Sequence, residues 1–391
     1  MSDQSIKLAK RMSHIEPFHV MNLLAIAKSM EAQGTEVVHM EIGEPDFVTP
    51  APVIRAAETA LKQGKTHYTP AVGLPALRER IAEFYKSQFG VDISPEQIII
   101  TPGASGALLL ALGVLIDPSD KVAMSDPGYP CNRHFVRMFE GDPVGIAVDA
   151  STRYQLTLES LNQSPAHDIT AVMLASPSNP TGTLLTPDHV KEWISDAETR
   201  QYYLLMDEIY QGLVYDRAVT TIAGQSNHAF VINSFSKYFC MTGWRLGWLV
   251  VPPGYQRQVD KLAQNIFLAP STLAQYAAIA AFDNESIQIL ESQREEFQRR
   301  RDFLVSAIQE LGFQLLVEPE GAFYLYADCS QLTDDSFDFC HTMLRKAGVA
   351  ITPGKDFGSY QSKRYVRFAY TTSLNQLEQG VEKIRNFLAT S

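Results

Sequence analysis

Residues 230–248 are Phe-Val-Ile-Asn-Ser-Phe-Ser-Lys-Tyr-Phe-Cys-Met-Thr-Gly-Trp-Arg-Leu-Gly-Trp. The apolar run that opens this stretch is typical of a buried strand. Lys237 and Arg245 therefore follow the end of a strand, where an open α/β sheet presents its ligand sites. Chemistry explains a lysine, an arginine and several hydroxyls at such a place better than packing does.

Further apolar runs of strand length alternate with helical patterns on either side of this stretch. They lie at residues 98–100, 122–124, 144–148, 171–174, 203–206 and 246–249. Alternation of short apolar runs with helices is the pattern of parallel βα units. The sequence thus predicts an α/β fold whose large sheet is mostly parallel, with helices on both faces.

The two ends of the chain differ from this central region. On the N-terminal side, helices are expected at residues 22–33, after Pro52 and after Gly73. On the C-terminal side, a charged helix is expected at 285–311, strands at 313–316, 323–326 and 364–369, and a helix at 337–347. We predict a large domain at residues 45–290 and a small α+β domain at 291–391. The N-terminal segment 1–44 is assigned to the small domain, and the boundary lies inside the long helix.

Length and composition limit the classes of protein that fit. The chain of 391 residues is longer than one core usually covers, and its apolar fraction of 45% is that of a globular protein. A formal charge of −11 argues against nucleic acid or anionic lipid as a partner. No apolar stretch has the length of a membrane span, and the four cysteines form no CxxC pair. We expect a cytoplasmic protein with reduced cysteines and no membrane partner.

Polar clusters follow several of the expected strands. Residues 101–106, Thr-Pro-Gly-Ala-Ser-Gly, precede an apolar helix and are either a plain turn or an anion site at a helix N-terminus. Tyr129, framed by prolines, is either a packed side chain or a stacking face for a flat ring. Asn179 stands between two prolines and either belongs to a turn or offers its amide to a ligand.

Asp207 and Lys237 have the strongest chemical interpretations. Asp207 ends an apolar strand, so its carboxylate either caps a helix or needs a positive partner such as a protonated ring nitrogen. Lys237 has the amine that a Schiff base requires, and Arg245, eight residues later, suits a phosphate. Taken singly, each basic residue is more often a surface charge.

Taken together and in this order, these motifs resemble those of class I/II aminotransferases, fold-type I pyridoxal-phosphate enzymes of the aspartate aminotransferase superfamily. The likeness extends from residues 42–47, Ile-Gly-Glu-Pro-Asp-Phe, to residues 365–367, Tyr-Val-Arg. It implies a large domain with a central, mostly parallel seven-stranded sheet and a smaller α+β domain. It also implies amino transfer from an amino acid to a 2-oxo acid through a Schiff base of pyridoxal 5'-phosphate on Lys237.

The resemblance assigns the remaining parts of the cofactor site. Asp207 is expected at the pyridine nitrogen, Asn179 and Tyr210 at the phenolic oxygen, and Tyr129 against the ring face. The phosphate is expected at Ala104, Ser105, Ser234 and Arg245, together with Tyr68 of the partner subunit, so the resemblance implies a homodimer. The substrate carboxylate is expected at Arg367, Asn179 and the backbone of Gly43.

Other functions stay open at this point. The same fold also serves carbon–sulfur β-lyases, and aminotransferase-like modules occur in transcription regulators, although this chain has no added basic segment. A metal enzyme is not expected, because the histidines are scattered and no HExxH motif is present. Ser105 stands where dicarboxylate-specific relatives often carry a lysine, which argues against aspartate or glutamate as the donor. Selectivity is expected from residues 14–18, 265–268 and 354–357.

Overall fold

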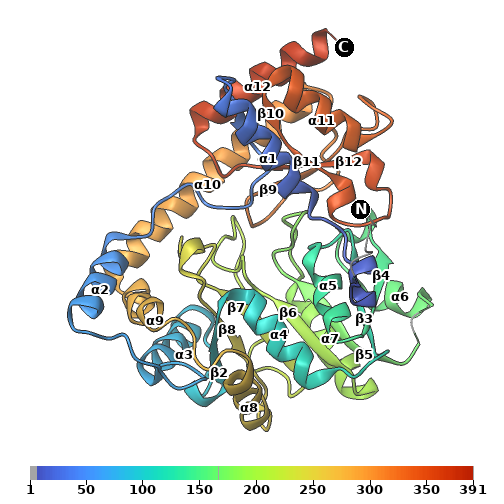
Figure 1. Ribbon diagram of the computed structural model, residues 1–391. Coiled ribbons are helices and arrows are strands. Elements are labelled where there is room, and N and C mark those ends of the chain that lie inside the picture. Colours follow the sequence, from blue (N-terminus) through green and yellow to red (C-terminus); the bar gives the residue numbers. More distant parts are fainter. Residues whose placement is uncertain (1–6, 166, 391) are drawn as a thin grey trace, which may run out of the picture.

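The structure is a computed structural model that describes residues 7–165 and 167–390. A seven-stranded sheet with its helices forms the larger part of the molecule, and a smaller part with a three-stranded sheet lies above it in Figure 1. Helix α10 (Asn284–Glu310) runs without a break from beside α2 and α9 up into the smaller part. In the described part of the chain, no helix is long and apolar enough to cross a bilayer.

The central sheet contains all seven runs that were predicted as strands. Its spatial order is β2-β8-β7-β6-β5-β3-β4, and β8 is antiparallel to both of its neighbours while the other pairs are parallel. The strands are β2 (Ile98–Thr101), β3 (Lys121–Asp126), β4 (Asp142–Ala147), β5 (Ile169–Ala175), β6 (Tyr203–Asp207), β7 (Ala229–Ser234) and β8 (Gly247–Val250). The predicted α/β fold is confirmed.

Both faces of this sheet are buried, which explains why its strands are apolar without alternation. Along β6, for example, Leu205 belongs to one core cluster while Leu204 and Met206 belong to the other. Helix α4 lies against β7 and β8 on the first face, whereas α7 packs on the second face through Trp193. The helices of this part are α2 (Ala51–Lys62), α3 (Pro75–Phe89), α4 (Gly103–Leu115), α5 (Cys131–Met138), α6 (Leu158–Gln163), α7 (Pro187–Arg200), α8 (Gln256–Ile266) and α9 (Thr272–Ile279).

The smaller part joins the two ends of the chain. Its antiparallel sheet has the order β11-β12-β9, and near it β1 pairs in parallel with β10. The strands are β1 (Val38–His39), β9 (Tyr324–Asp328), β10 (Val349–Ala350), β11 (Thr352–Pro353) and β12 (Tyr365–Ala369). The helices are α1 (His19–Ala32), α11 (Ser336–Ala347) and α12 (Leu374–Ala389). Short 3-10 helices lie at Lys10–His14, Pro95–Gln97, Ala150–Thr152, Thr242–Trp244, Ala280–Phe282, Gly354–Asp356 and Ser362–Arg364.

The strand predicted at residues 313–316 is not formed. Gln314 alone makes a bridge, to Asp328 at the end of β9. Phe313 turns its ring into the core against Phe368, and Leu316 is exposed to solvent. Because only Gln314 pairs, and the residues around it face either the core or solvent, the segment does not form a strand.

Candidate active site

A cavity of about 410 Å³ lies at the carboxyl ends of β5, β6 and β7 and collects nearly all of the predicted site residues. Those that line it are Gly43, Ala104, Ser105, Tyr129, Asn179, Asp207, Tyr210, Ser234, Lys237, Arg245 and Arg367. Tyr68 is the exception, because it does not line the cavity of its own chain and the residue is 82% exposed.

Lys237 lies just beyond β7 and points its amine at the N-terminal segment. Its Nζ donates a hydrogen bond of 2.5 Å to the backbone oxygen of Gly43. Burial lowers the pKa of Lys237 to about 8; Glu44 opposes this change, and Arg367 and Arg245 add to it. The amine is therefore much closer to its neutral, nucleophilic form than an exposed lysine is.

Asp207 ends β6 and presents a carboxylate to the same cavity. Its Oδ1 accepts a hydrogen bond of 3.0 Å from the backbone N–H of Ile209. Burial raises the pKa of Asp207 to about 6, although the Ile209 hydrogen bond and the charge of Lys237 pull it back. Among the described residues, no Lys, Arg or His makes an ion pair with it. The carboxylate thus lacks the positive partner that burial makes favourable.

Arg367 reaches the cavity from β12 of the smaller part. Its Nη1 donates to Asn179 Oδ1 at 2.9 Å and its Nη2 donates to the backbone oxygen of Glu41 at 2.5 Å. The guanidinium lies 4.2 Å from the ring centre of Tyr324 and 4.8 Å from that of Phe357. Its Nε is buried without a partner in the described chain. A rigidly held, incompletely satisfied guanidinium of this kind suits a carboxylate.

The turn between β2 and α4 meets Arg245 closely. Gly103 has a φ of +72°, and a Cβ at this position would come within 2.9 Å of Arg245 Nη2. A Cβ on Gly247 would lie 2.9 Å from the backbone nitrogen of Ala104. Only glycines allow this approach, which brings the start of α4 beside the arginine. Together they form a cradle for an anion at the N-terminus of α4.

Ser234 is less free than the sequence suggested. Its Oγ lies 2.9 Å from Ser236 Oγ and 3.1 Å from the backbone oxygen of Leu246, and it accepts the N–H of Ser236 at 3.0 Å. Ser236 also lines the cavity, although sequence reasoning did not select it. Its position two residues after Ser234, on the loop that carries Lys237, could have identified it as a cavity residue from the sequence.

Tyr324 is the main residue of the cavity wall that sequence reasoning missed. It lies in β9, and its hydroxyl is 2.8 Å from that of Tyr210. A Cβ on Gly43 would collide with the Tyr324 hydroxyl at 1.9 Å, which explains the glycine. In the sequence Tyr324 belongs to an aromatic strand whose two faces look alike. Of the segments expected to control selectivity, residues 14–18 contribute Phe18 to the cavity, whereas 265–268 do not line it.

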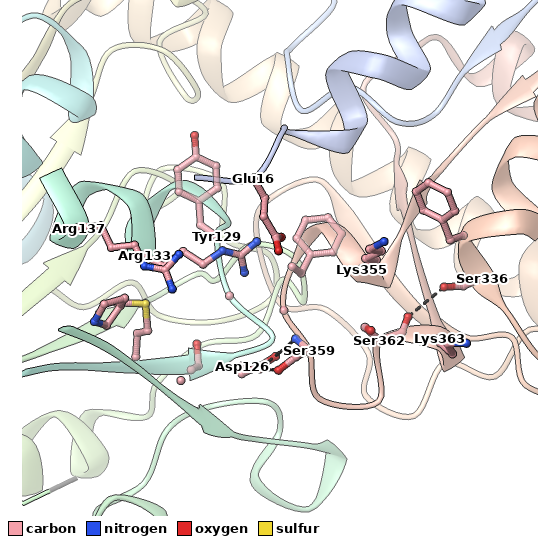
Figure 2. A pocket seen from close by; sticks show the side chains of 18 of the residues that line it. Glu16, Asp126, Tyr129, Arg133, Arg137, Ser336, Lys355, Ser359, Ser362 and Lys363 are labelled. Atoms are coloured by element: carbon pink, nitrogen blue, oxygen red, sulfur yellow. Dashed lines mark hydrogen bonds between the residues drawn. The ribbon is translucent and has the colours of Figure 1, made fainter. Parts of the chain in front are cut away.

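A second hollow of about 610 Å³, seen in Figure 2, shares Tyr129 with the first cavity. Across it, the Asp126 carboxylate accepts hydrogen bonds from the backbone of Ser359 and Tyr360 and from the Ser359 hydroxyl at 2.8 Å. Gly128 N–H donates to the Phe357 backbone oxygen at 2.9 Å. These contacts attach the loop that carries Phe357, and hence the ring over Arg367, to the large sheet.

Comparison with known proteins identifies the family. The family model for aminotransferase class I and II matches residues 35–384. The chain belongs to the class I and II aminotransferases. It is 38% identical to a (5-formylfuran-3-yl)methyl phosphate transaminase from Methanocaldococcus jannaschii, over 97% of this chain and 99% of that one. It is 37% identical to a valine–pyruvate aminotransferase from Mycobacterium tuberculosis, over 96% and 97% of the two chains.

Solved structures agree with this assignment. A crystal structure of an aminotransferase from Mycobacterium tuberculosis matches with a TM-score of 0.95 and 36% identity, covering 99% of this chain and 100% of that one. The protein is therefore an enzyme of the fold-type I class, a pyridoxal-phosphate-dependent aminotransferase. The predicted family, fold, cofactor and reaction class are confirmed.

The cavity of this aminotransferase fits pyridoxal phosphate. Asp207 offers a buried carboxylate without a cation, which suits a protonated pyridine nitrogen. The cradle of Gly103, Ala104 and Arg245 suits a phosphate, and the amine of Lys237 faces the same space. The donor set therefore matches the three ends of the cofactor.

Proposed function

We propose that this aminotransferase exchanges an amino group between an amino acid and a 2-oxo acid, with Lys237 as the group that moves the proton at the substrate Cα. One observation carries the proposal: a buried amine with a lowered pKa shares a cavity with Asp207 and Arg367. Bound pyridoxal phosphate supplies the electron sink that makes loss of this proton possible. The residues of the chain bind and orient the cofactor and the substrate, and Lys237 moves the proton.

The parts of the cofactor are assigned to separate residues in this proposal. Asp207 holds the pyridine nitrogen in its protonated form, and Tyr129 lies against the ring. Asn179 and Tyr210 donate to the phenolic oxygen. The phosphate takes hydrogen bonds from the Ala104 and Ser105 amides and from Ser234 and charge from Arg245. Support comes from the common cavity, which all of these side chains line.

Arg367 is proposed to bind the substrate carboxylate, with Asn179 and the backbone of Gly43 beside it. The guanidinium already has both terminal nitrogens oriented by Asn179 and Glu41. Because Arg367 belongs to β12, substrate binding draws the small domain toward the large one and excludes water. We place the small domain at residues 1–44 and 291–391, the large domain at 45–290, and the boundary inside α10.

The amino donor is proposed to have an uncharged, apolar side chain. The cationic side chains that line the cavity in the described chain are Lys237, Arg245 and Arg367, and each already has a role. Phe18, Met21 and Leu24, from α1 and the segment before it, line the cavity as well. A distal carboxylate would face this apolar wall without a partner. The relative that is named for valine and pyruvate supports the same class.

We further propose a cytoplasmic homodimer in which Tyr68 of the partner subunit completes the phosphate site. Support comes from the 82% exposure of Tyr68 and from its absence in the cavity of its own chain. Mixing two inactive variants, Lys237→Ala and Tyr68→Ala, tests this arrangement. Hybrid dimers with one intact site should regain activity. Monomers in sedimentation, or no regain after subunit exchange, would contradict it.

The reaction is tested by half-reactions on the purified enzyme. Valine, phenylalanine and aspartate are added one at a time, and the absorbance of the bound cofactor is followed. The proposal expects valine or phenylalanine to change the spectrum and pyruvate to restore it, with aspartate much slower. Release of pyruvate and ammonia without an added 2-oxo acid would instead indicate β-elimination.

A further inference from the structure

Two cations of the proposed mechanism bind to one short piece of backbone, residues 39–43, which we call segment 39–43. Arg367 Nη2 donates to the backbone oxygen of Glu41 at 2.5 Å. Lys237 Nζ donates to the backbone oxygen of Gly43 at 2.5 Å. The two donors come from different parts of the fold, so the position of this segment sets the position of both.

Two threonines fix the same segment, Thr352 from β11 and Thr371 from just beyond β12. Thr352 Oγ1 donates to the Glu41 backbone oxygen at 3.1 Å, and Thr371 Oγ1 donates to the Ile42 backbone oxygen at 2.8 Å. Segment 39–43 is therefore held along its backbone by side chains. A shift at Glu41 is transmitted to Arg367 directly.

The side chain of Glu41 is fully buried and depends on one partner. His39 Nδ1 lies 2.8 Å from Glu41 Oε1, and the other carboxylate oxygen has no hydrogen-bond partner in the described chain. No lysine or arginine among the described residues makes an ion pair with Glu41. A buried carboxylate without a cation is costly, so His39 is the group that compensates its charge.

His39 lies between two carboxylates. Its Nε2 lies 3.2 Å from Glu31 Oε1 on α1, and Lys28 binds the other oxygen of Glu31 at 2.8 Å. The hydrogen bond to Glu41 raises the pKa of His39, against the opposing effect of burial, and Glu31 adds to the increase. Among the residues that the structure describes, Glu41 and Glu31 are the charged groups that act on the ring. Strand β10 places Ala350 opposite His39, and Lys383 of α12 binds the Glu36 backbone oxygen instead.

We propose that His39 and Glu41 act as a positioning pair for amino transfer. While His39 is protonated, the pair holds segment 39–43 in the place that presents Arg367 to the substrate carboxylate. When His39 loses its proton, the pair loses the cation that holds the buried Glu41 side chain, and the segment relaxes. This inference rests on the proposed role of Arg367. It predicts that substrate binding weakens as the pH rises through the raised pKa of His39.

Steady-state kinetics of His39→Gln between pH 6 and pH 9 test the pair, with His189→Gln on α7 as the matched control. Loss of one charge-assisted contact should raise the KM for the amino donor about 3- to 10-fold at pH 7, with kcat nearly unchanged. The wild-type KM should rise with pH, and this rise should be absent in His39→Gln. The pH-dependent absorbance of the bound cofactor, which reports on Lys237, supplies a readout that does not depend on turnover.

Glu41→Gln and NMR titration of the histidine rings complete the test. In wild-type holoenzyme the His39 ring should titrate at the pH where KM changes. Glu41→Gln should move the midpoint of the His39 titration and the rise in KM to lower pH. An unchanged KM profile in His39→Gln, or a His39 titration that does not coincide with it, would overturn the inference. Loss of stability alone, with the wild-type pH profile retained, would also overturn it. Absence of any amino transfer by the wild type would instead remove the proposed function.

Discussion

The Arg367 guanidinium donates a hydrogen bond of 2.9 Å to the side-chain oxygen of Asn179, which lies 188 residues earlier in the chain. Arg367 belongs to the three-stranded sheet, and Asn179 follows β5 of the seven-stranded sheet. The contact therefore joins the two parts of the molecule at the edge of the cavity. Each residue fixes the orientation of the other, and the proposed role of Arg367 in binding the substrate carboxylate depends on this contact.

Arg367→Lys should weaken substrate binding more than it slows turnover. A lysine loses the fork of two parallel donors and the flat group that lies over Tyr324 and Phe357. We expect KM for the amino donor to rise roughly 10- to 100-fold, which corresponds to about 1.5 to 3 kcal/mol. Arg364→Lys is the matched control, because Arg364 lies three residues earlier and pairs with Asp328 outside the cavity. An equal effect of both substitutions would contradict the assignment.

Asp207→Asn should stabilise the cofactor-free protein and weaken cofactor binding. The folded-state pKa of about 6 exceeds the ordinary value of 3.8, so the cost of the buried charge is absent below pH 4 and complete above pH 6. At pH 8 the variant should gain roughly 1 to 3 kcal/mol in free energy of unfolding, and the gain should vanish near pH 4. Urea unfolding of the cofactor-free protein measures this difference. The added stability that pyridoxal phosphate gives to the wild type should be reduced in the variant.

Lys237→Ala should abolish amino transfer while the fold is retained. The substitution removes a buried amine whose pKa is lowered to about 8, so it relieves a desolvation cost and leaves the Gly43 backbone oxygen exposed to the cavity. Circular dichroism should match the wild type and the cofactor-free variant should be at least as stable to heat, whereas the cofactor absorbance should change. Lys191→Ala on the exposed face of α7 is the control and should behave as wild type. Turnover of Lys237→Ala at the wild-type rate would refute the role of this lysine.

Gly358→Ala should disturb the loop that places Phe357 over Arg367. A Cβ at residue 358 would lie 1.8 Å from Asp126 Oδ1, so the loop must move away from β3. We expect a loss of about 1 to 3 kcal/mol in free energy of unfolding and a higher KM.

The double variant with Asp126→Ala separates this collision from a general effect of alanine. Because Asp126→Ala removes the colliding carboxylate, adding Gly358→Ala to it should cost much less than Gly358→Ala costs alone. If the losses in free energy of unfolding simply add, the collision with Asp126 is not the cause of the cost of Gly358→Ala.

The seven strands and their order along the chain were predictable because both faces of the sheet are buried. Each strand is then an uninterrupted apolar run, which is visible without any knowledge of its neighbours. Asp207, Ser234 and Lys237 were found for the same reason: each stands where such a run ends, and the carboxyl ends of parallel strands share one edge. The strand expected at 313–316 failed because a run of the right length lacked a partner along most of its length.

The sequence by itself determined the family, the cofactor and the side chains at the strand ends, since these depend on residue type and order. The tertiary structure decided which distant groups meet. Tyr324 joins Tyr210, Asp126 binds the loop around Phe357, and the carbonyls of Glu41 and Gly43 hold Arg367 and Lys237. The reason is physical. The sequence of a short strand that is buried on both faces does not show which side chains face the cavity, and a backbone carbonyl is the same in every residue. Only the packed chain gives these groups their partners.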